Sequence, residues 1–231
     1  MKLLFKFLLT TCVLMTALSC EVHLEDNTRI LVEGTIIDEN NSPISDAKIS
    51  VLIKRSNYSE GENQYVIGEG YSNAEGEFSV TSLYDKDEDF AIEIHGGEDY
   101  STYVYKTNTL EYTPLDLTFN LETVSLKKLA TFNYHIERTS GEANTLRYTF
   151  KYIEGFCLEY YEGTTLNEFQ SSCYQEQVVS QFLNDSNPDI EWLLSIPFGG
   201  VVEFTYAIND EPEITEFITI NEDNYDFTFT Y

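Results

Sequence analysis

Basic residues are scarce in this 231-residue sequence, which has 13 Lys and Arg against 40 Asp and Glu and a formal net charge of −27 at pH 7. A charge of that size and sign repels phosphate backbones and anionic lipid headgroups. The composition therefore argues against nucleic-acid binding and against an electrostatic attachment to membranes. Histidine is also rare, and none of His23, His95 and His135 lies in a metal-binding motif, so we predict no metal site.

Short catalytic motifs are missing as well. The sequence has no Gly-x-Ser-x-Gly elbow, no phosphate-binding loop and no dinucleotide fingerprint. Carboxylates are so numerous that no single pair of them indicates glycoside hydrolysis. We therefore predict a protein that is not an enzyme and that uses no cofactor.

Cysteine is limited to four residues. Cys12 falls within the leader-like start of the chain, and Cys20 directly follows it. The remaining pair, Cys157 and Cys173, is an even number in a chain with export features, which predicts a disulfide. Two buried free thiols are the alternative.

The first 19 residues have the pattern of an export signal. Lys2 and Lys6 precede an apolar run over residues 7–18, which is too short to span a bilayer. We predict a signal peptide over residues 1–19 and a tether over residues 20–27.

The run Ala17-Leu18-Ser19-Cys20 resembles the lipobox of bacterial lipoproteins. The resemblance implies that Cys20 is lipidated and anchors the chain to the outer membrane, facing the periplasm or the cell surface. Ala17 departs from the pattern, since Leu is common at that position. Cleavage by the ordinary signal peptidase and retention as an uncleaved anchor are the alternatives.

Apolar residues make up 42% of the sequence and aromatic residues 14%, enough for well-packed cores despite the acidity. Apolar and polar residues alternate over residues 30–37, 47–53 and 78–80, which is typical of β-strands. In the turn Asn73-Ala74-Glu75-Gly76, we expect Gly76 to adopt a positive φ where the chain reverses.

The spacing of several residues in this stretch resembles the carboxypeptidase-regulatory-like domain, a transthyretin-like β-sandwich. The matching residues are Gly34, Asp38, Pro43, Ala47, Val51, Asn73, Gly76, Phe78 and Leu83. Asp46 departs from the pattern, because Gly is common there. The resemblance implies a non-catalytic folding or interaction module over residues 28–121, with about seven strands and the last near residues 115–121.

Residues 125–231 show a second set of alternating segments, which predicts a C-terminal sandwich of the immunoglobulin or fibronectin type. The fold class is therefore all-β, with two tandem antiparallel β-sandwiches. Residues 164–183 are ambiguous, since Thr165 and Glu168 have capping-box spacing, but we favour a loop followed by a strand. Trp192 is in phase with apolar neighbours and is expected in the core.

Two groups of side chains are candidate binding residues. Tyr100, Tyr103 and Tyr105, with Tyr112 nearby, could form an aromatic strip that stacks on sugars; the alternative is that they cover the core. Asp85, Asp87 and Asp89 stand at alternate positions, as acidic residues do in calcium loops. We favour a solvated loop over a calcium site.

These observations predict a lipid-anchored, non-enzymatic cell-envelope protein that acts as an accessory binding module for a glycan or protein partner. The alternative is a structural subunit, pilin-like or adhesin-like, that assembles by strand exchange. A basic cleavage site ahead of a removable first strand would favour the alternative, and Arg29 is the one candidate for such a site.

Overall fold

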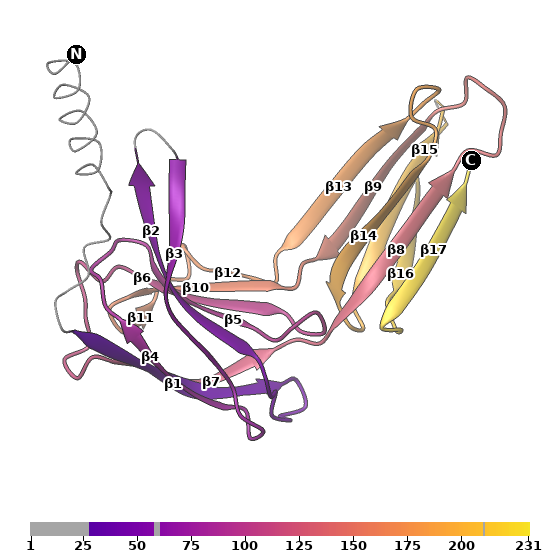
Figure 1. The fold of residues 1–231 in the computed structure, drawn as a ribbon. Helices are drawn as coiled ribbons and strands as arrows, with labels where there is room; N and C mark the ends of the chain where they lie inside the picture. The colour runs from indigo at the N-terminus through magenta and orange to yellow at the C-terminus, as the bar shows by residue number, and fades with distance from the viewer. Residues whose placement is uncertain (1–27, 58–60, 210) are drawn as a thin grey trace, which may run out of the picture.

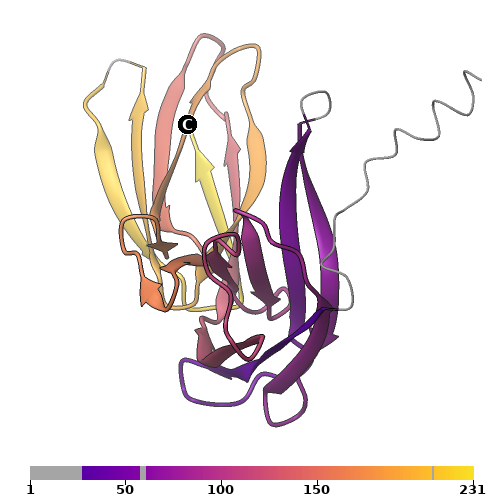
Figure 2. The same ribbon diagram turned by 90° about the vertical axis from the view of Figure 1, so that its left-hand side faces the viewer.

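The computed structural model describes residues 28–57, 61–209 and 211–231. Those residues form strands β1 to β17 and no helix, which confirms the all-β prediction. The strands are arranged in two sandwich-like modules joined at an angle, as Figure 1 shows; in the turned view of Figure 2 the two modules partly overlap. We call them the first and second module.

The first module packs a small sheet against a large one. The small sheet has the order β4 (Glu77–Leu83), β1 (Arg29–Asp38), β7 (Thr118–Leu126). The large sheet has the order β11 (Thr165–Leu166), β10 (Phe156–Glu162), β6 (Thr102–Thr107), β5 (Phe90–His95), β2 (Lys48–Asn57), β3 (Gly61–Tyr71), with β12 (Ser172–Cys173) paired to β10.

The sequence pattern of the first module accounts for its core. Alternate residues of β4 and β5 are buried, and they meet apolar residues of β1 and β2 in one cluster. Gly76 has the expected positive φ of 77°, and a Cβ there would lie 2.4 Å from the carbonyl oxygen of Ile36. Asp46 has a φ of 57°, a left-handed conformation that Gly adopts most readily.

The last strand of the small sheet begins later than predicted. Residues 115–121 were expected to form it, but β7 starts at Thr118 and continues to Leu126. Leu117 has a φ of 58°, which interrupts the extended backbone, and Leu115 is fully exposed. The apolar alternation that begins at Leu115 therefore belongs partly to a loop.

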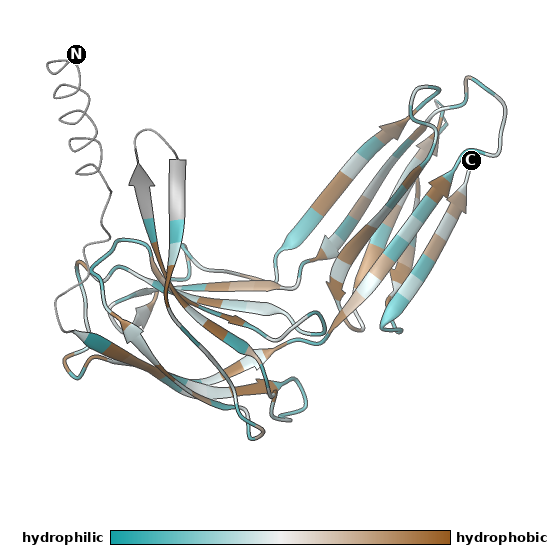
Figure 3. Cartoon of the chain, in the orientation of Figure 1, coloured by the Kyte–Doolittle hydropathy of each residue, from teal (hydrophilic) through white to brown (hydrophobic). Residues whose placement is uncertain are grey.

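The second module is a four-on-three sandwich. One sheet has the order β13 (Glu176–Leu183), β9 (Leu146–Ile153), β15 (Val201–Ile208), β16 (Ile214–Thr219), and the other has β14 (Ile190–Pro197), β8 (Leu129–Glu137), β17 (Asn224–Thr230). Hydrophobic and hydrophilic bands alternate along these strands in Figure 3. The apolar faces bury an aromatic cluster in which the rings of Phe150 and Phe204 stack 4.7 Å apart.

Trp192 does not occupy the predicted core position. It is paired with the buried Tyr134 on β8, so it lies on the face of β14 that points toward the core. However, β14 is an edge strand, and the side chain of Trp192 is 62% exposed. The edge of the sandwich leaves this ring uncovered.

The structure departs from the predicted division into residues 28–121 and 125–231 at one segment. After β9 the chain leaves the second module, forms β10, β11 and β12 in the large sheet of the first module, and returns as β13. The alternation of β10 does not reveal which sheet the strand joins, because both modules have edge strands with which it could pair. The ambiguous residues 164–183 thus contain all of β13, as the loop-and-strand interpretation predicted, and the expected loop before it also contains the short strands β11 and β12.

Three strand pairs are parallel, which departs from the antiparallel prediction. β10 runs parallel to β6, β1 to β7, and β17 to β8. In each module the first strand of the described chain is therefore paired in parallel with the last strand of the small sheet. These pairs are β1 with β7 and β8 with β17.

Candidate functional site

One face of the large sheet gathers aromatic and acidic side chains where β6 and β10 lie side by side. The register pairs Tyr103 with Cys157 and Tyr105 with Glu159. Since directly paired residues point to the same face of a sheet, Tyr103, Tyr105, Glu159 and Tyr161 share that face. Tyr105 also contacts Phe119 of β7, edge to face at 6.2 Å between ring centroids, so this face looks toward the small sheet.

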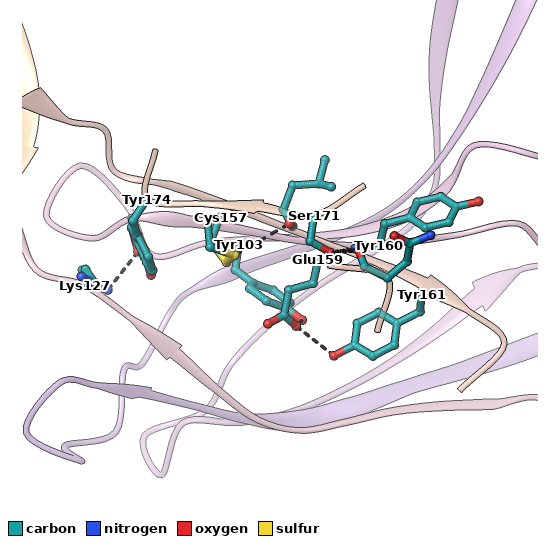
Figure 4. Close-up of a disulfide and its surroundings, with 12 residues drawn as sticks. Tyr103, Lys127, Cys157, Glu159, Tyr160, Tyr161, Ser171 and Tyr174 are labelled. Atoms are coloured by element: carbon teal, nitrogen blue, oxygen red, sulfur yellow. Dashed lines mark hydrogen bonds between the residues drawn. A yellow bond between two sulfur atoms is a disulfide. The ribbon is translucent and has the colours of Figure 1, made fainter. Parts of the chain in front are cut away.

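Glu159 connects the two strands through hydrogen bonds. The hydroxyl of Tyr103 donates to Oε2 of Glu159 at 2.7 Å, and the hydroxyl of Tyr161 donates to the same oxygen at 2.9 Å. Figure 4 shows the carboxylate between the two rings, next to the disulfide. The ring of Tyr161 stacks on Tyr105 with centroids 4.7 Å apart. Each of these rings is thereby held in one orientation.

The phenols of this group stay protonated far above neutral pH. Burial, followed by the hydrogen bond to Glu159, raises the pKa of Tyr161 to about 12. Burial and the neighbouring Tyr161 raise the pKa of Tyr105 to about 12. The pKa of Tyr103 is raised further, mainly by burial and then by Glu159. The three hydroxyls are thus neutral donors under physiological conditions.

A cavity of about 770 Å³ opens beside these rings, between the large sheet and the loop that leads into β7. Its size lies within the range of ordinary ligand pockets. The described lining contains no Lys, Arg or His. The lining residues are Tyr103, Tyr105, Tyr112, Pro114, Leu115, Asp116, Thr118, Phe119, Asn120, Leu121, Glu122, Tyr161, Gly163 and Thr164.

The loop side of the cavity is shaped by two side-chain-to-backbone hydrogen bonds. Oδ1 of Asp116 accepts from the backbone N–H of Thr118 at 3.1 Å, and Oδ1 of Asn120 accepts from that of Glu122 at 2.8 Å. Such local bonds stabilise turns that interrupt a strand. They place the exposed carboxylates of Asp116 and Glu122 at the cavity.

The predicted aromatic strip is only partly assembled. Tyr103, Tyr105 and Tyr112 line the cavity, whereas Tyr100 is absent from its lining and forms a bridge with Lys128 near the module junction. Tyr103 is 8% exposed and belongs to the core cluster, so the core-covering alternative holds for that residue. Sequence reasoning missed Tyr161, because only the β6–β10 pairing brings it beside Tyr105.

The disulfide lies beside Glu159 and outside the cavity lining. Cys157 and Cys173 are bonded to each other in the structure, and they face one another on β10 and β12. Their sulfurs and a carboxylate oxygen of Glu159 lie within 4.8 Å of one another. Sulfurs that share a disulfide are not thiolate ligands, so this grouping provides no metal site while the bond is intact.

The acidic loop of Asp85, Asp87 and Asp89 is held in place by contacts within the loop and with Lys106 and Thr109. The carboxylate of Asp87 accepts from the backbone N–H of Asp89 at 2.7 Å, and Asp89 forms an ion pair with Lys106. The hydroxyl oxygen of Thr109 lies 3.2 Å from the carbonyl oxygen of Asp85. Asp85 and Asp87 are buried, so the loop is not the solvated one that the sequence predicts. Whether it binds calcium stays a prediction.

Two predicted features concern the start of the chain. Cys20, the signal peptide and the tether lie outside the described residues. Arg29 is the first residue of β1, which lies between β4 and β7, so a cut there would leave that strand in place. Among the described residues, no helix is long and apolar enough to cross a membrane.

No family model matches the chain, and no curated protein is similar to it. The resemblance to the carboxypeptidase-regulatory-like family therefore stays a prediction.

Among solved structures, the TIE protein of Bacillus anthracis matches 89% of this chain at 14% identity and a TM-score of 0.31. A streptococcal ancillary pilin matches 89% at 11% identity and a TM-score of 0.33. The tip fimbrial protein Mfa3 of Porphyromonas gingivalis matches 83% at 10% identity and a TM-score of 0.28. The matches cover 34%, 63% and 82% of those chains, respectively. Similarities this low carry no inference about what the present chain binds.

Proposed function

We propose that this chain is a lipid-anchored protein of a bacterial cell envelope that binds a glycan or protein partner and does not catalyse a reaction. The observation that carries the proposal is the tyrosine-lined cavity between β6, β10 and β7. Its rings are fixed by stacking and by the shared carboxylate of Glu159. Rings fixed before binding lose little conformational entropy when a partner arrives.

The protonation states in the cavity suit binding better than proton transfer. A general acid or base works best with a pKa near the working pH. Tyr105 and Tyr161 have pKa values of about 12, because they are buried. Their hydroxyls therefore stay protonated, and we propose no catalytic role for them.

Lipidation of Cys20 would hold the cavity at a membrane surface. Each buried CH₂ of an acyl chain contributes about 0.8 kcal/mol, so several chains on one cysteine give lasting attachment. The resemblance of residues 17–20 to a lipobox supports this part of the proposal.

Two exposed leucines of the loop that leads into β7, Leu110 and Leu115, allow a matched test. Leu115 lines the cavity and is fully exposed, whereas Leu110 is 54% exposed and lies outside the lining. The purified full chain in nonionic detergent is used to capture partners from envelope extract. Leu115→Ala should weaken capture, while Leu110→Ala should leave it unchanged. Both variants should melt like the wild type, since exposed substitutions alter stability by only about 0.5 kcal/mol.

Equal capture by the wild type, Leu115→Ala and Tyr112→Ala would reject the cavity as the binding site. Turnover of a glycan or peptide by the purified wild type would reject the non-enzymatic part. If the captured partner is a second copy of this chain, the assembly-subunit alternative replaces the accessory role.

A further inference from the structure

The cavity combines aromatic rings with carboxylates and contains no compensating cation. Asp116 and Glu122 are both exposed at the cavity, and Glu159 lies behind the rings. Within the part of the chain that the structure describes, no Lys or Arg forms an ion pair with Asp116 or Glu122. A positively charged group would be attracted to these carboxylates, whereas a neutral ligand would not.

Three lysines of the described chain already have partners. Lys106 pairs with Asp89, and Lys48 pairs with Glu69 at 2.6 Å. Lys127 lies with its Nζ 4.3 Å from the centroid of the Tyr174 ring. None of these lysines lines the cavity, and a basic partner protein can supply the missing cation.

The same chain shows what that contact would look like. Lys127 over Tyr174 and Lys128 over Phe198, at 4.9 Å, are both ammonium–ring contacts in the described structure. Tyrosine rings attract cations through their negative faces, and the raised pKa values of Tyr105 and Tyr161 keep both rings as neutral phenols. Tyr105 and Tyr161 also stack on each other, so that each ring covers one face of the other.

We infer that the cavity receives the charged end of a lysine or arginine side chain presented by a basic segment of a partner protein. The inference rests on the proposed binding function and names the ligand class of the same cavity. Asp116 and Glu122 accept hydrogen bonds from the cation, as carboxylates commonly do from guanidinium groups. The net charge of −27 draws such a partner toward the protein over long range.

The test uses the full chain in nonionic detergent and three probes. They are the peptides acetyl-Gly-Arg-Gly-Arg-Gly-amide and acetyl-Gly-Gln-Gly-Gln-Gly-amide and the neutral oligosaccharide maltohexaose. Calorimetry should give an affinity about tenfold higher for the arginine peptide than for the glutamine peptide at low salt. The difference should shrink as the salt concentration rises.

A pair of charge-matched variants locates the effect. Glu122→Gln removes a charge at the cavity and should weaken binding of the arginine peptide several-fold. Glu98→Gln removes the same charge from an exposed turn outside the lining and should have a much smaller effect. Equal affinities for the two peptides, or equal effects of the two substitutions, would overturn the inference.

The outcomes separate the inference from the proposed function. If maltohexaose binds and Tyr112→Ala abolishes that binding, the cavity is a binding site for neutral sugars and only the cationic inference fails. If no probe binds and partner capture is indifferent to Leu115→Ala and Tyr112→Ala, the proposed function fails as well.

Discussion

Glu159 has more influence on the site than its position in the sequence suggests. It is one of 40 acidic residues, yet its Oε2 accepts hydrogen bonds from tyrosines on two different strands. Hydrogen bonds to a charged acceptor are stronger than neutral ones. Nothing local distinguishes Glu159 from the other glutamates, and only the register of β10 against β6 gives it this role.

The tyrosines predict how stability changes with alkaline pH. An unfolded tyrosine ionises near pH 10, whereas Tyr105 and Tyr161 have pKa values of about 12 in the folded protein. Between these values the unfolded chain binds fewer protons than the folded one, so stability falls as pH rises from about 10 to about 12. Below pH 10 these two residues contribute no pH dependence.

Denaturant unfolding at pH 9 and pH 11 measures this loss, and phenolate absorbance follows the ionisation directly. Tyr161→Phe should remove part of the slope between the two pH values. Ionisation of all 17 tyrosines near pH 10 in the folded protein would contradict the expectation.

The predicted lipidation of Cys20 implies that the protein is found in the membrane fraction. If Cys20 is acylated, Cys20→Ala should yield soluble protein or an unprocessed precursor, because the acyl chains that partition into the bilayer are lost. Membrane fractionation and mass spectrometry of the N-terminal peptide measure the result. Unchanged fractionation, together with an N-terminal peptide that lacks acyl mass, would rule out the anchor.

At the level of strands, most of the architecture is readable from alternation. The buried faces of β1, β4, β5, β8 and β9 follow the period of two that the sequence shows. The pairing partner of a strand cannot be predicted in this way. Alternation determines which face of the strand is buried, but it does not determine which strand lies beside it. The placement of β10 beside β6, and hence half of the candidate site, therefore lay beyond sequence reasoning.

The disulfide should stabilise the first module. Cys157 and Cys173 are 16 residues apart and join β10 to β12. In the chain-entropy model, a loop of about 15 residues contributes about 3 kcal/mol. Reduction should therefore lower the melting temperature of the first module and largely spare the second, the reverse of what the sequence boundary at residue 125 implies.

Thermal unfolding with and without reductant, followed by hydrogen exchange of the two modules, measures this effect. The variant with Cys157→Ser and Cys173→Ser should reproduce the reduced protein. Destabilisation confined to the second module would contradict the placement of β10.

For the whole molecule, the two cores are partly interdependent. The second module contributes residues 156–173 to the large sheet of the first module, yet keeps its own core cluster. The ends of this excursion lie together, since the backbone N–H of Glu154 donates to the carbonyl oxygen of Gln175 at 3.1 Å. A short linker can therefore replace the excursion without disturbing β9 and β13.

We expect such a replacement of residues 155–174 by a short Gly-Ser linker to unfold the modules unequally. The first module loses β10 and the side chains of Cys157 and Tyr174 from its core, so its protection from hydrogen exchange should fall. The second module should keep its transition, reported by the fluorescence of Trp192, the single tryptophan. Equal loss in both modules would show that they form one cooperative unit.

The parallel pairs β1–β7 and β8–β17 determine how the molecule bears mechanical load. A pull between residues 28 and 231 draws β1 and β7 in opposite directions along their common axis, and does the same to β8 and β17. The hydrogen bonds of each pair are then loaded together in shear, whereas a hairpin pulled from its open end unzips one bond at a time. A protein tethered at its N-terminus and gripped at the far end of the second module would therefore resist extension at two shear clamps in series.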